Sequence, residues 1–182
     1  DHIAVRLRGT AGQSLGAFAT QGLKLEVIGD ANDYVGKGLS GGTIIVRPSA
    51  AASVVAHENT IIGNTVLYGA TSGRLSAAGQ AGERLCVRNS GATAVVEGAG
   101  TNACEYMTGG RVVILGEVGD NFGAGMTGGM AFVYDPDNSF VSRLNPASLQ
   151  VVRIGTAHWE AELKALVEAH AAATDSALAA RL

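Results

Sequence analysis

The sequence predicts an all-β fold, a right-handed parallel β-helix (solenoid) with coils of about 19–20 residues and a short C-terminal helical cap. Three observations support it: 26 glycines among 182 residues, a glycine motif that repeats at a fixed offset, and apolar residues at helical spacing near the C-terminus. Glycine inside a strand or helix costs about 0.5–1 kcal/mol relative to alanine, so this many glycines indicate regular turns or close backbone approaches.

The clearest repeat joins residues 100–110 (GTNACEYMTGG) to residues 119–129 (GDNFGAGMTGG), at an offset of 19 residues. Short β-branched runs follow the glycines, and we expect strands at 23–27, 43–46, 65–68, 84–87, 92–96, 111–115 and 130–134. Self-similarity at a fixed period predicts a solenoid. The units are too short for common helical repeats and lack a hexapeptide period, so a right-handed β-helix is favoured by elimination. Whether each coil has two or three faces stays open.

Eleven glycines are the expected structural turn residues, because most of them come just before a predicted strand or between repeats. They are Gly36, Gly38, Gly41, Gly42, Gly109, Gly110, Gly116, Gly119, Gly123, Gly128 and Gly129.

The predicted organisation is a β-helix over residues 1–140 and an extension over 141–182 with one or two capping helices. Apolar residues recur at helical spacing from Trp159 to His170, and Thr156 can cap that helix. We expect Glu160 and Lys164 to pair, and a second short helix to begin near Thr174. The apolar stripe of the helix is expected to cover the last coil, because terminal solenoid units need capping.

The composition argues against several partners and compartments. The net charge is −3 without a basic stripe, so nucleic acid and membranes are not expected partners. Two cysteines are too few for a disulfide framework, and no apolar stretch reaches the ~20 residues of a membrane span, which favours a cytoplasmic protein. The chain begins with Asp1 rather than Met, so an excised domain and a free-standing protein both stay open.

The pattern G-x-G-x-x-G occurs twice, at Gly36–Gly41 and Gly123–Gly128. This dinucleotide fingerprint requires a helix after its last glycine, because the pyrophosphate binds at the helix N-terminus. Both copies are followed by predicted strands instead. We therefore expect turn geometry, and binding of neither nucleotide nor flavin.

The remaining candidate side chains form no recognisable catalytic or metal-binding constellation. The four histidines, His2, His57, His158 and His170, lie far apart without ligands at metal spacing. Possible nucleophiles also lack a positioned base: they are Cys86, Cys104 and Ser90. The sequence thus predicts no catalytic, cofactor-binding or metal-binding residue, and favours turn or stacked-ladder roles for Asn32, Asn102 and Asn121.

A docking surface is expected on one face of the sheet. Alignment of three strands at the repeat offset stacks Val95, Ile114 and Val133 in the predicted interior, with Thr93, Val112 and Ala131 beside them. The alternate residues of these strands, which point to the outer face, are also apolar, and an exposed apolar stripe usually marks an interface. We expect a neighbouring domain or the terminal helices to cover its residues, which are Val96, Val113, Leu115, Phe132 and Tyr134, with Ala94.

The segments GDANDYVGKGLSGG (29–42) and GEVGDNFG (116–123) resemble the signature of the glutamate synthase C-terminal domain, and the second fits its G-x-x-G-x-x-x-G repeat. The resemblance extends from about Gly9 to the end of the chain. It implies a non-catalytic domain of an enzyme that makes two glutamates from glutamine and 2-oxoglutarate, bracing its glutaminase and flavin-binding synthase domains and bordering the ammonia route.

The family resemblance places the cofactors of the parent enzyme outside this chain. Those cofactors are FMN and an iron–sulfur cluster, with NADPH or ferredoxin as the reductant. Implied partners are the glutaminase and synthase domains of the same large chain, and possibly other subunits. Two alternatives stay open: a β-helical assembly subunit like that of formylmethanofuran dehydrogenase, and a free-standing scaffold or binding module.

Overall fold

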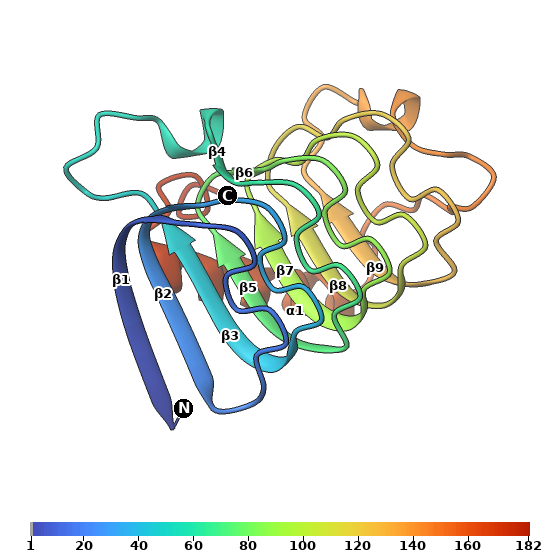
Figure 1. Cartoon of the computed structure of the whole chain (residues 1–182). Helices are drawn as coiled ribbons and strands as arrows, with labels where there is room; N and C mark the ends of the chain where they lie inside the picture. The colour runs from blue at the N-terminus through green and yellow to red at the C-terminus, as the bar shows by residue number, and fades with distance from the viewer. Residues whose placement is uncertain (1) are drawn as a thin grey trace.

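The computed structural model describes residues 2–182, so Asp1 of the predicted first domain lies outside the described residues. It is a right-handed parallel β-solenoid of about seven coils with one C-terminal α-helix, as the sequence predicts (Figure 1). The long wall of the solenoid is a parallel sheet whose neighbouring strands come from successive coils. Its strands are β1 (Ile3–Ala11), β2 (Leu23–Ala31), β3 (Ser40–Arg47), β5 (Ser72–Ala77), β7 (Ser90–Val96), β8 (Thr108–Ile114) and β9 (Gly128–Val133).

A short second face connects the long sheet to the rest of each coil. It contains β4 (Thr60–Ile62) and β6 (Gln80–Ala81). Parallel bridges join Ala31, Ile62, Ala81, Ala99 and Val118 along the solenoid axis. Three of the five residues in this column are alanines.

The third face is a wall of alternating left-handed residues. Every second residue has positive φ in residues 14–18, 34–38, 65–69, 84–88, 102–106 and 121–125. Amides of these residues bond to the neighbouring coils in both directions: Arg84 N donates to Thr101 O (2.8 Å) and Cys86 N to Val66 O (2.8 Å). We call these six segments the left-handed wall. Each coil therefore has three faces, a point that the sequence left open.

Two predicted strands are wrong, because residues 65–68 and 84–87 belong to the left-handed wall. Their coils enter the long sheet later, through β5 and β7. The apparently even spacing of the predicted strand starts also concealed an insertion in the third coil. Thr43 pairs with Arg74, a much longer step than the repeat, and the extra chain forms a protruding loop with the 3-10 helix η1 (Ala56–Glu58).

The interior is one continuous apolar column between the three faces, and its side chains include Ile44, Leu75 and Ile114. At its C-terminal end the solenoid is closed by residues 139–149, which contain η2 (Phe140–Ser142). The rings of Phe140 and Phe122 meet edge to face at 5.1 Å. This segment closes the end of the last coil, whereas α1 covers that coil from the side, where Trp159 packs on Phe132 of β9.

The helix α1 (Ala157–Thr174) instead lies along the outer face of the long sheet, behind the strands in Figure 1. Thr156 caps its first turn by accepting a hydrogen bond from Trp159 N (3.4 Å), as predicted. Lys164 pairs with Glu168 at 3.8 Å and not with Glu160. After Asp175, the described chain forms a turn over residues 177–181 and no second helix. Among the described residues, no helix has the length and apolar character needed to cross a membrane.

Candidate functional site beneath the C-terminal helix

The outer face of the long sheet carries an apolar stripe that α1 covers. Val95, Val113 and Phe132 stand in one row, because the strand register pairs them directly. With Leu115 they form a buried cluster against helix residues, which are Trp159, Leu163, Leu166, Val167 and Ala171. Phe132 and Trp159 have ring centroids 6.1 Å apart. The sequence predicts that either a neighbouring domain or the terminal helices cover this stripe, and in the structure α1 covers it.

The predicted alignment of β7 with β8 is wrong by one position, so four side chains of β7 face the opposite side of the sheet from the one predicted. A bulge between Ser90 and Thr93 makes the step from β7 to β8 shorter than the repeat, so Val96, rather than Val95, pairs with Ile114. Val96 and Ala94 therefore lie inside the solenoid, while Val95 and Thr93 face α1. Val112 and Ile114 of β8 and Ala131 and Val133 of β9 face the interior, as predicted. Tyr134, predicted to be covered, is 46% exposed.

The eleven predicted turn glycines lie in the left-handed wall, at the starts of strands and on the turns between faces. Gly110 has φ +90° at the start of the β8 pairing, a region that side-chain-bearing residues rarely adopt. Gly128 has ordinary φ, but a Cβ there would collide with the carbonyl oxygen of Thr108 in the preceding coil. Backbone conformation and coil spacing are therefore two separate reasons for glycine.

Both G-x-G-x-x-G segments run from the left-handed wall into a strand. Gly36 and Gly38 occupy alternate left-handed positions before β3, and Gly123 and Gly125 do so before β9. The amides of Gly36 and Gly38 are already bonded to Leu15 O (2.8 Å) and Tyr68 O (2.9 Å) in adjacent coils. A pyrophosphate binds to free amides at the N-terminus of a helix. These segments do not fit one, because strands follow them and their glycine amides are already hydrogen-bonded.

The two cysteines lie inside the solenoid on neighbouring coils and are fully buried. Burial raises the pKa of the Cys104 thiol to about 12. Burial, and then the adjacent Cys104, raise the pKa of Cys86 well above its usual value. Thiols held in the protonated form by an apolar interior do not fit an iron–sulfur cluster, which needs thiolates. Within residues 2–182, no group of three or more His, Cys, Asp or Glu side chains converges as a metal site.

A buried polar cluster fixes the end of α1 to the sheet. His170 Nε2 lies 3.4 Å from Glu97 Oε1, and Ser176 Oγ donates a hydrogen bond to that same oxygen. Glu97 directly follows β7 and, like His170, is almost completely buried. Serine, histidine and glutamate are the residue types of a hydrolase triad, but here serine contacts the carboxylate and not the histidine. The arrangement provides attachment rather than an activated nucleophile.

Glu97 and Ser176 were not among the sequence candidates. The available signal was an acidic residue at the end of the apolar run of β7, where a carboxylate needs a partner. The identity of that partner depends on contacts with the distant C-terminal segment, which one sequence does not reveal.

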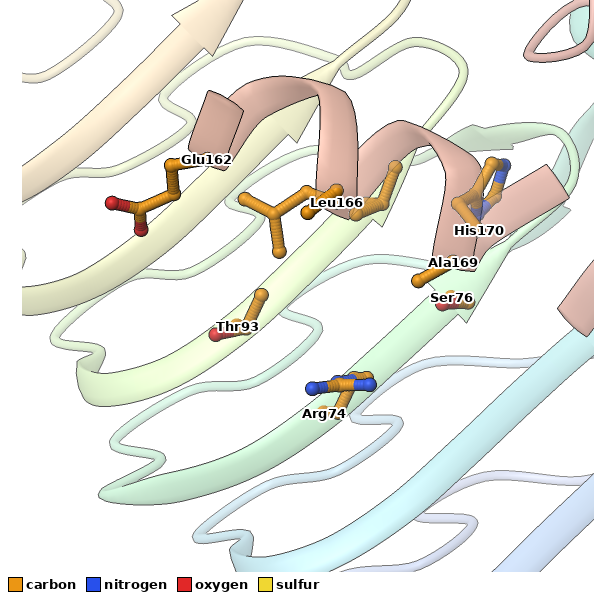
Figure 2. A pocket seen from close by; sticks show the side chains of 9 residues that line it. Arg74, Ser76, Thr93, Glu162, Leu166, Ala169 and His170 are labelled. Carbon is orange, nitrogen blue, oxygen red and sulfur yellow. The ribbon is translucent and has the colours of Figure 1, made fainter. Parts of the chain in front are cut away.

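A cavity of about 160 Å³ lies beside this cluster, between α1 and strands β5 and β7 (Figure 2). Its polar lining includes Arg74, Ser76, Thr93 and Glu162. Glu162 forms an ion pair with Arg111 and lies 3.6 Å from His158. Two buried polar atoms lack hydrogen-bond partners within residues 2–182, His170 Nδ1 and Glu97 Oε2.

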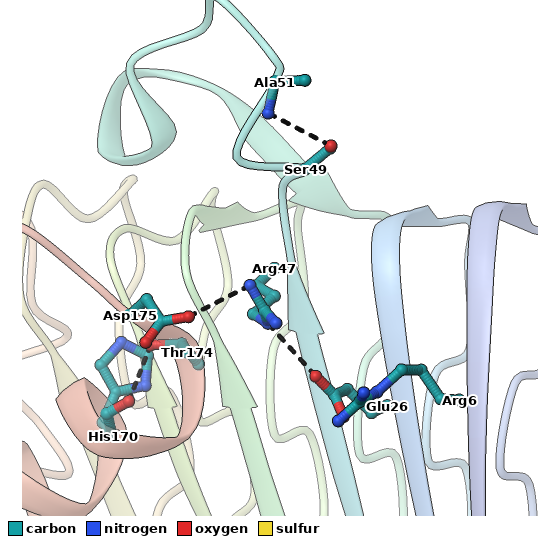
Figure 3. A network of polar contacts seen from close by, with 8 residues as sticks. All are labelled: Arg6, Glu26, Arg47, Ser49, Ala51, His170, Thr174 and Asp175. Carbon is teal, nitrogen blue, oxygen red and sulfur yellow. Dashed lines mark hydrogen bonds and ion pairs between the residues drawn. The ribbon is translucent and has the colours of Figure 1, made fainter.

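A chain of ion pairs connects the first three strands to the end of α1 (Figure 3). Arg6 and Arg47 bind the two carboxylate oxygens of Glu26 at 2.8 and 3.3 Å, and Arg47 also reaches Asp175 at 3.2 Å. Burial raises the pKa of Glu26, but the hydrogen bonds and the positive charges of Arg6 and Arg47 together outweigh it, so the pKa lies below its ordinary value. This network positions the helix end over β3.

An asparagine ladder runs along the left-handed wall. Asn121 Nδ2 donates to Asn102 Oδ1 at 2.9 Å, and Asn145 Nδ2 donates to Asn121 Oδ1 at 3.1 Å. Asn32 instead makes a local turn, in which its Oδ1 accepts from Asp33 N (3.0 Å). The expected turn and ladder roles of the three asparagines are thus confirmed.

The fold and these contacts define a class, a glycine-rich right-handed β-solenoid whose own C-terminal helix covers its outer sheet face. The sequence profile of the GXGXG motif family matches residues 1–182, and the chain belongs to this family. In this chain, the alternating G-x-G spacing is the spacing of the left-handed residues in the third wall.

The similar curated proteins are glutamate synthases. Identity is 67% over 181 residues to the glutamate synthase [NADPH] large chain of Azospirillum brasilense, covering 100% of this chain and 12% of that protein. It is 53% over 174 residues to the ferredoxin-dependent enzyme of Pyropia yezoensis, covering 96% and 11%. It is 51% over 182 residues to glutamate synthase [NADH] of Schizosaccharomyces pombe, covering 100% and 9%. The chain is therefore a glutamate synthase domain that spans about one tenth of these relatives.

Proposed function

We propose that this chain is the non-catalytic structural domain of a cytoplasmic glutamate synthase, where it braces the glutaminase and flavin-binding synthase domains and borders the ammonia route. FMN, the iron–sulfur cluster and the NADPH or ferredoxin site then belong to other parts of the large chain. Identities of 51–67% to such enzymes support the assignment to a glutamate synthase.

The observation that carries the structural role is the coil-to-coil bonding on all three faces. The long sheet, the short bridges and the left-handed wall are each hydrogen-bonded along the axis. Seven strands at ~4.8 Å spacing make a body roughly 30 Å long. Because its interior is apolar throughout and its helix is fixed by buried contacts, this body resists bending and suits a spacer between domains.

The candidate residue types for catalysis support the same proposal. Both thiols are buried with raised pKa values, and the buried serine, histidine and glutamate contact one another without a free nucleophile. A brace should influence the coupling between active sites and leave the chemistry at each site intact.

The test uses the complete glutamate synthase and compares three rates: glutamine hydrolysis, ammonia-dependent synthesis and glutamine-dependent synthesis. Ser176→Ala loosens the end of α1, and His158→Ala is the control, because His158 is 74% exposed. We expect Ser176→Ala to lower glutamine-dependent synthesis severalfold more than either partial reaction, and His158→Ala to change none. Equal loss of one partial reaction and the coupled reaction would argue for a catalytic role instead.

A further inference from the structure

The two ends of the solenoid differ in how they are covered. Residues 139–149 close the C-terminal end, whereas β1 at the other end pairs only with β2 within residues 2–182 (Figure 1). The inward row of β1, which continues the apolar interior, is left open. Its residues Ile3, Val5 and Leu7 are 61%, 37% and 38% exposed, although they register with Leu23, Leu25 and Val27 of the next coil.

The backbone of β1 also has a free edge. Ile3 N donates to Gly22 O (3.0 Å) and Asn32 N donates to Ala11 O (3.1 Å), so the odd-numbered residues of β1 make the bonds to β2. In a parallel pair of strands, the backbone N–H and C=O groups of the residues in between point away from the partner strand. Ala4, Arg6, Arg8 and Thr10 therefore direct their N–H and C=O groups outward. A free edge of this length is a template for a further strand, which soluble proteins usually protect.

The edge strand carries two arginines, Arg6 and Arg8, and no acidic residue within residues 2–11. Arg6 is 63% exposed although it bonds to Glu26, and Arg8 has no carboxylate within ion-pair distance in residues 2–182. A two-fold pairing of β1 with β1 of a second copy would bring like charges into the same contact, which opposes it. A segment with an apolar row and acidic flanking residues matches both the open row and the charge.

We propose that this open end is a docking surface for an extended segment of the same glutamate synthase large chain, apolar toward the solenoid interior and acidic at its rim, which adds a strand to β1. The proposal rests on the proposed function and names its attachment point. The matched region is 9–12% of the relatives' length, so most of such a chain lies outside it. A tethered segment also has a high effective concentration, which favours it over a separate molecule.

Amide hydrogen exchange tests the strand pairing directly. The 182-residue chain is compared with the Azospirillum brasilense large chain in which this sequence replaces the corresponding region. We expect peptides from residues 3–11 to exchange at least about tenfold more slowly in the large chain, because their outward amides become bonded. Peptides from β8 should exchange equally in both and serve as the internal control. Equal exchange of β1 in both proteins would overturn the proposal.

Substitutions test the open row and the edge separately. In the large chain, Val5→Lys with Leu7→Lys should restore fast exchange of β1, whereas Val54→Lys with Val55→Lys on the exposed insertion should leave it slow. Thr10→Pro removes one outward amide without touching the β1–β2 bonds, and it should also restore fast exchange near residue 10. Retained protection in both the paired-lysine and proline variants would exclude β1 as the contact.

Light scattering distinguishes a second copy from the tethered segment. We expect the 182-residue chain to remain monomeric; a dimer that Thr10→Pro dissociates would show that the edge accepts another copy and would overturn the proposal. Failure here is separable from failure of the brace. If β1 exchange is unchanged while Ser176→Ala still uncouples the enzyme, the docking surface is wrong and the structural function stands.

Discussion

The long sheet and the left-handed wall repeat along the same axis but place different demands on the sequence. Residues of the sheet have extended backbone, and their apolar rows alternate between the interior and α1. The left-handed wall accepts glycine, leucine, cysteine, arginine and asparagine at equivalent positions with φ near +60°. Apolar pattern alone does not separate the two, because Val66 and Leu67 in the wall have the composition of a strand. Glycine spacing and hydrogen bonding between coils distinguish them.

The largest expected effect lies where strands of the sheet approach most closely. Gly128→Val would drive a side chain into the carbonyl oxygen of Thr108, and we expect a loss on the order of 4 kcal/mol of unfolding free energy. Gly69→Ala in the left-handed wall meets no atom within 4 Å, so only its left-handed backbone should cost, about 1–2 kcal/mol. Urea unfolding measures both. Equal losses in the two variants would contradict the claim that glycine is required for different reasons in the sheet and in the left-handed wall.

The second largest effect is expected where α1 covers the long sheet, because the left-handed wall has no such helix over it in residues 2–182. Phe132→Ala removes the ring that packs on Trp159, with an expected loss of about 3 kcal/mol and early release of α1. Limited proteolysis should then cut within residues 150–182 before the coils unfold. The exposed aromatic Phe18 on the left-handed wall is the matched control, and Phe18→Ala should cost less than about 1 kcal/mol. Simultaneous loss of helix and coils in Phe132→Ala would contradict an independent cover.

A smaller effect is expected from the polar ladder of the left-handed wall. Asn121→Ala removes the bonds to Asn102 and Asn145 and the longer one to Glu105, and a net loss of about 1–2 kcal/mol is expected from these exposed hydrogen bonds. Asn121 is also left-handed at φ 58°, so Asn121→Gly separates the ladder from the backbone. Thermal melting should rank native above glycine and glycine above alanine. Alanine matching the native protein would show that the ladder contributes nothing.

The smallest effect should have opposite signs on the two walls. Arg88 is exposed and left-handed (φ 56°), so Arg88→Gly relieves backbone strain and should raise stability by about 0.5–1 kcal/mol. Arg74 is exposed on an extended strand, where Arg74→Gly should lower stability by a similar amount. Calorimetry of the two variants under identical conditions provides the comparison. A loss of stability in both would mean that the left-handed wall carries no strain.

The sequence predicts the fold of this chain better than it predicts the buried polar contacts. The fixed offset between residues 100–110 and 119–129 correctly predicted coils, because each unit packs on a copy of itself. The same offset failed at β7, where a bulge shortens one step and exchanges the faces of Val95 and Val96. A shift by a single position inverts every side chain in a strand, so register is the least secure part of such a prediction. The buried Glu97 contacts could not be predicted because their partners are on the distant C-terminal segment.

By itself, the sequence determined the solenoid, its glycine-dependent coil contacts and the capped C-terminal helix, because these follow from local backbone preferences and a repeating period. Only the tertiary structure decided the third face, the closing of the last coil by residues 139–149, and the seat of α1 on the sheet. Those features depend on hydrogen bonds and apolar contacts between segments far apart in the chain. The open edge of β1 also belongs to them, since a strand is an edge only in relation to its neighbours.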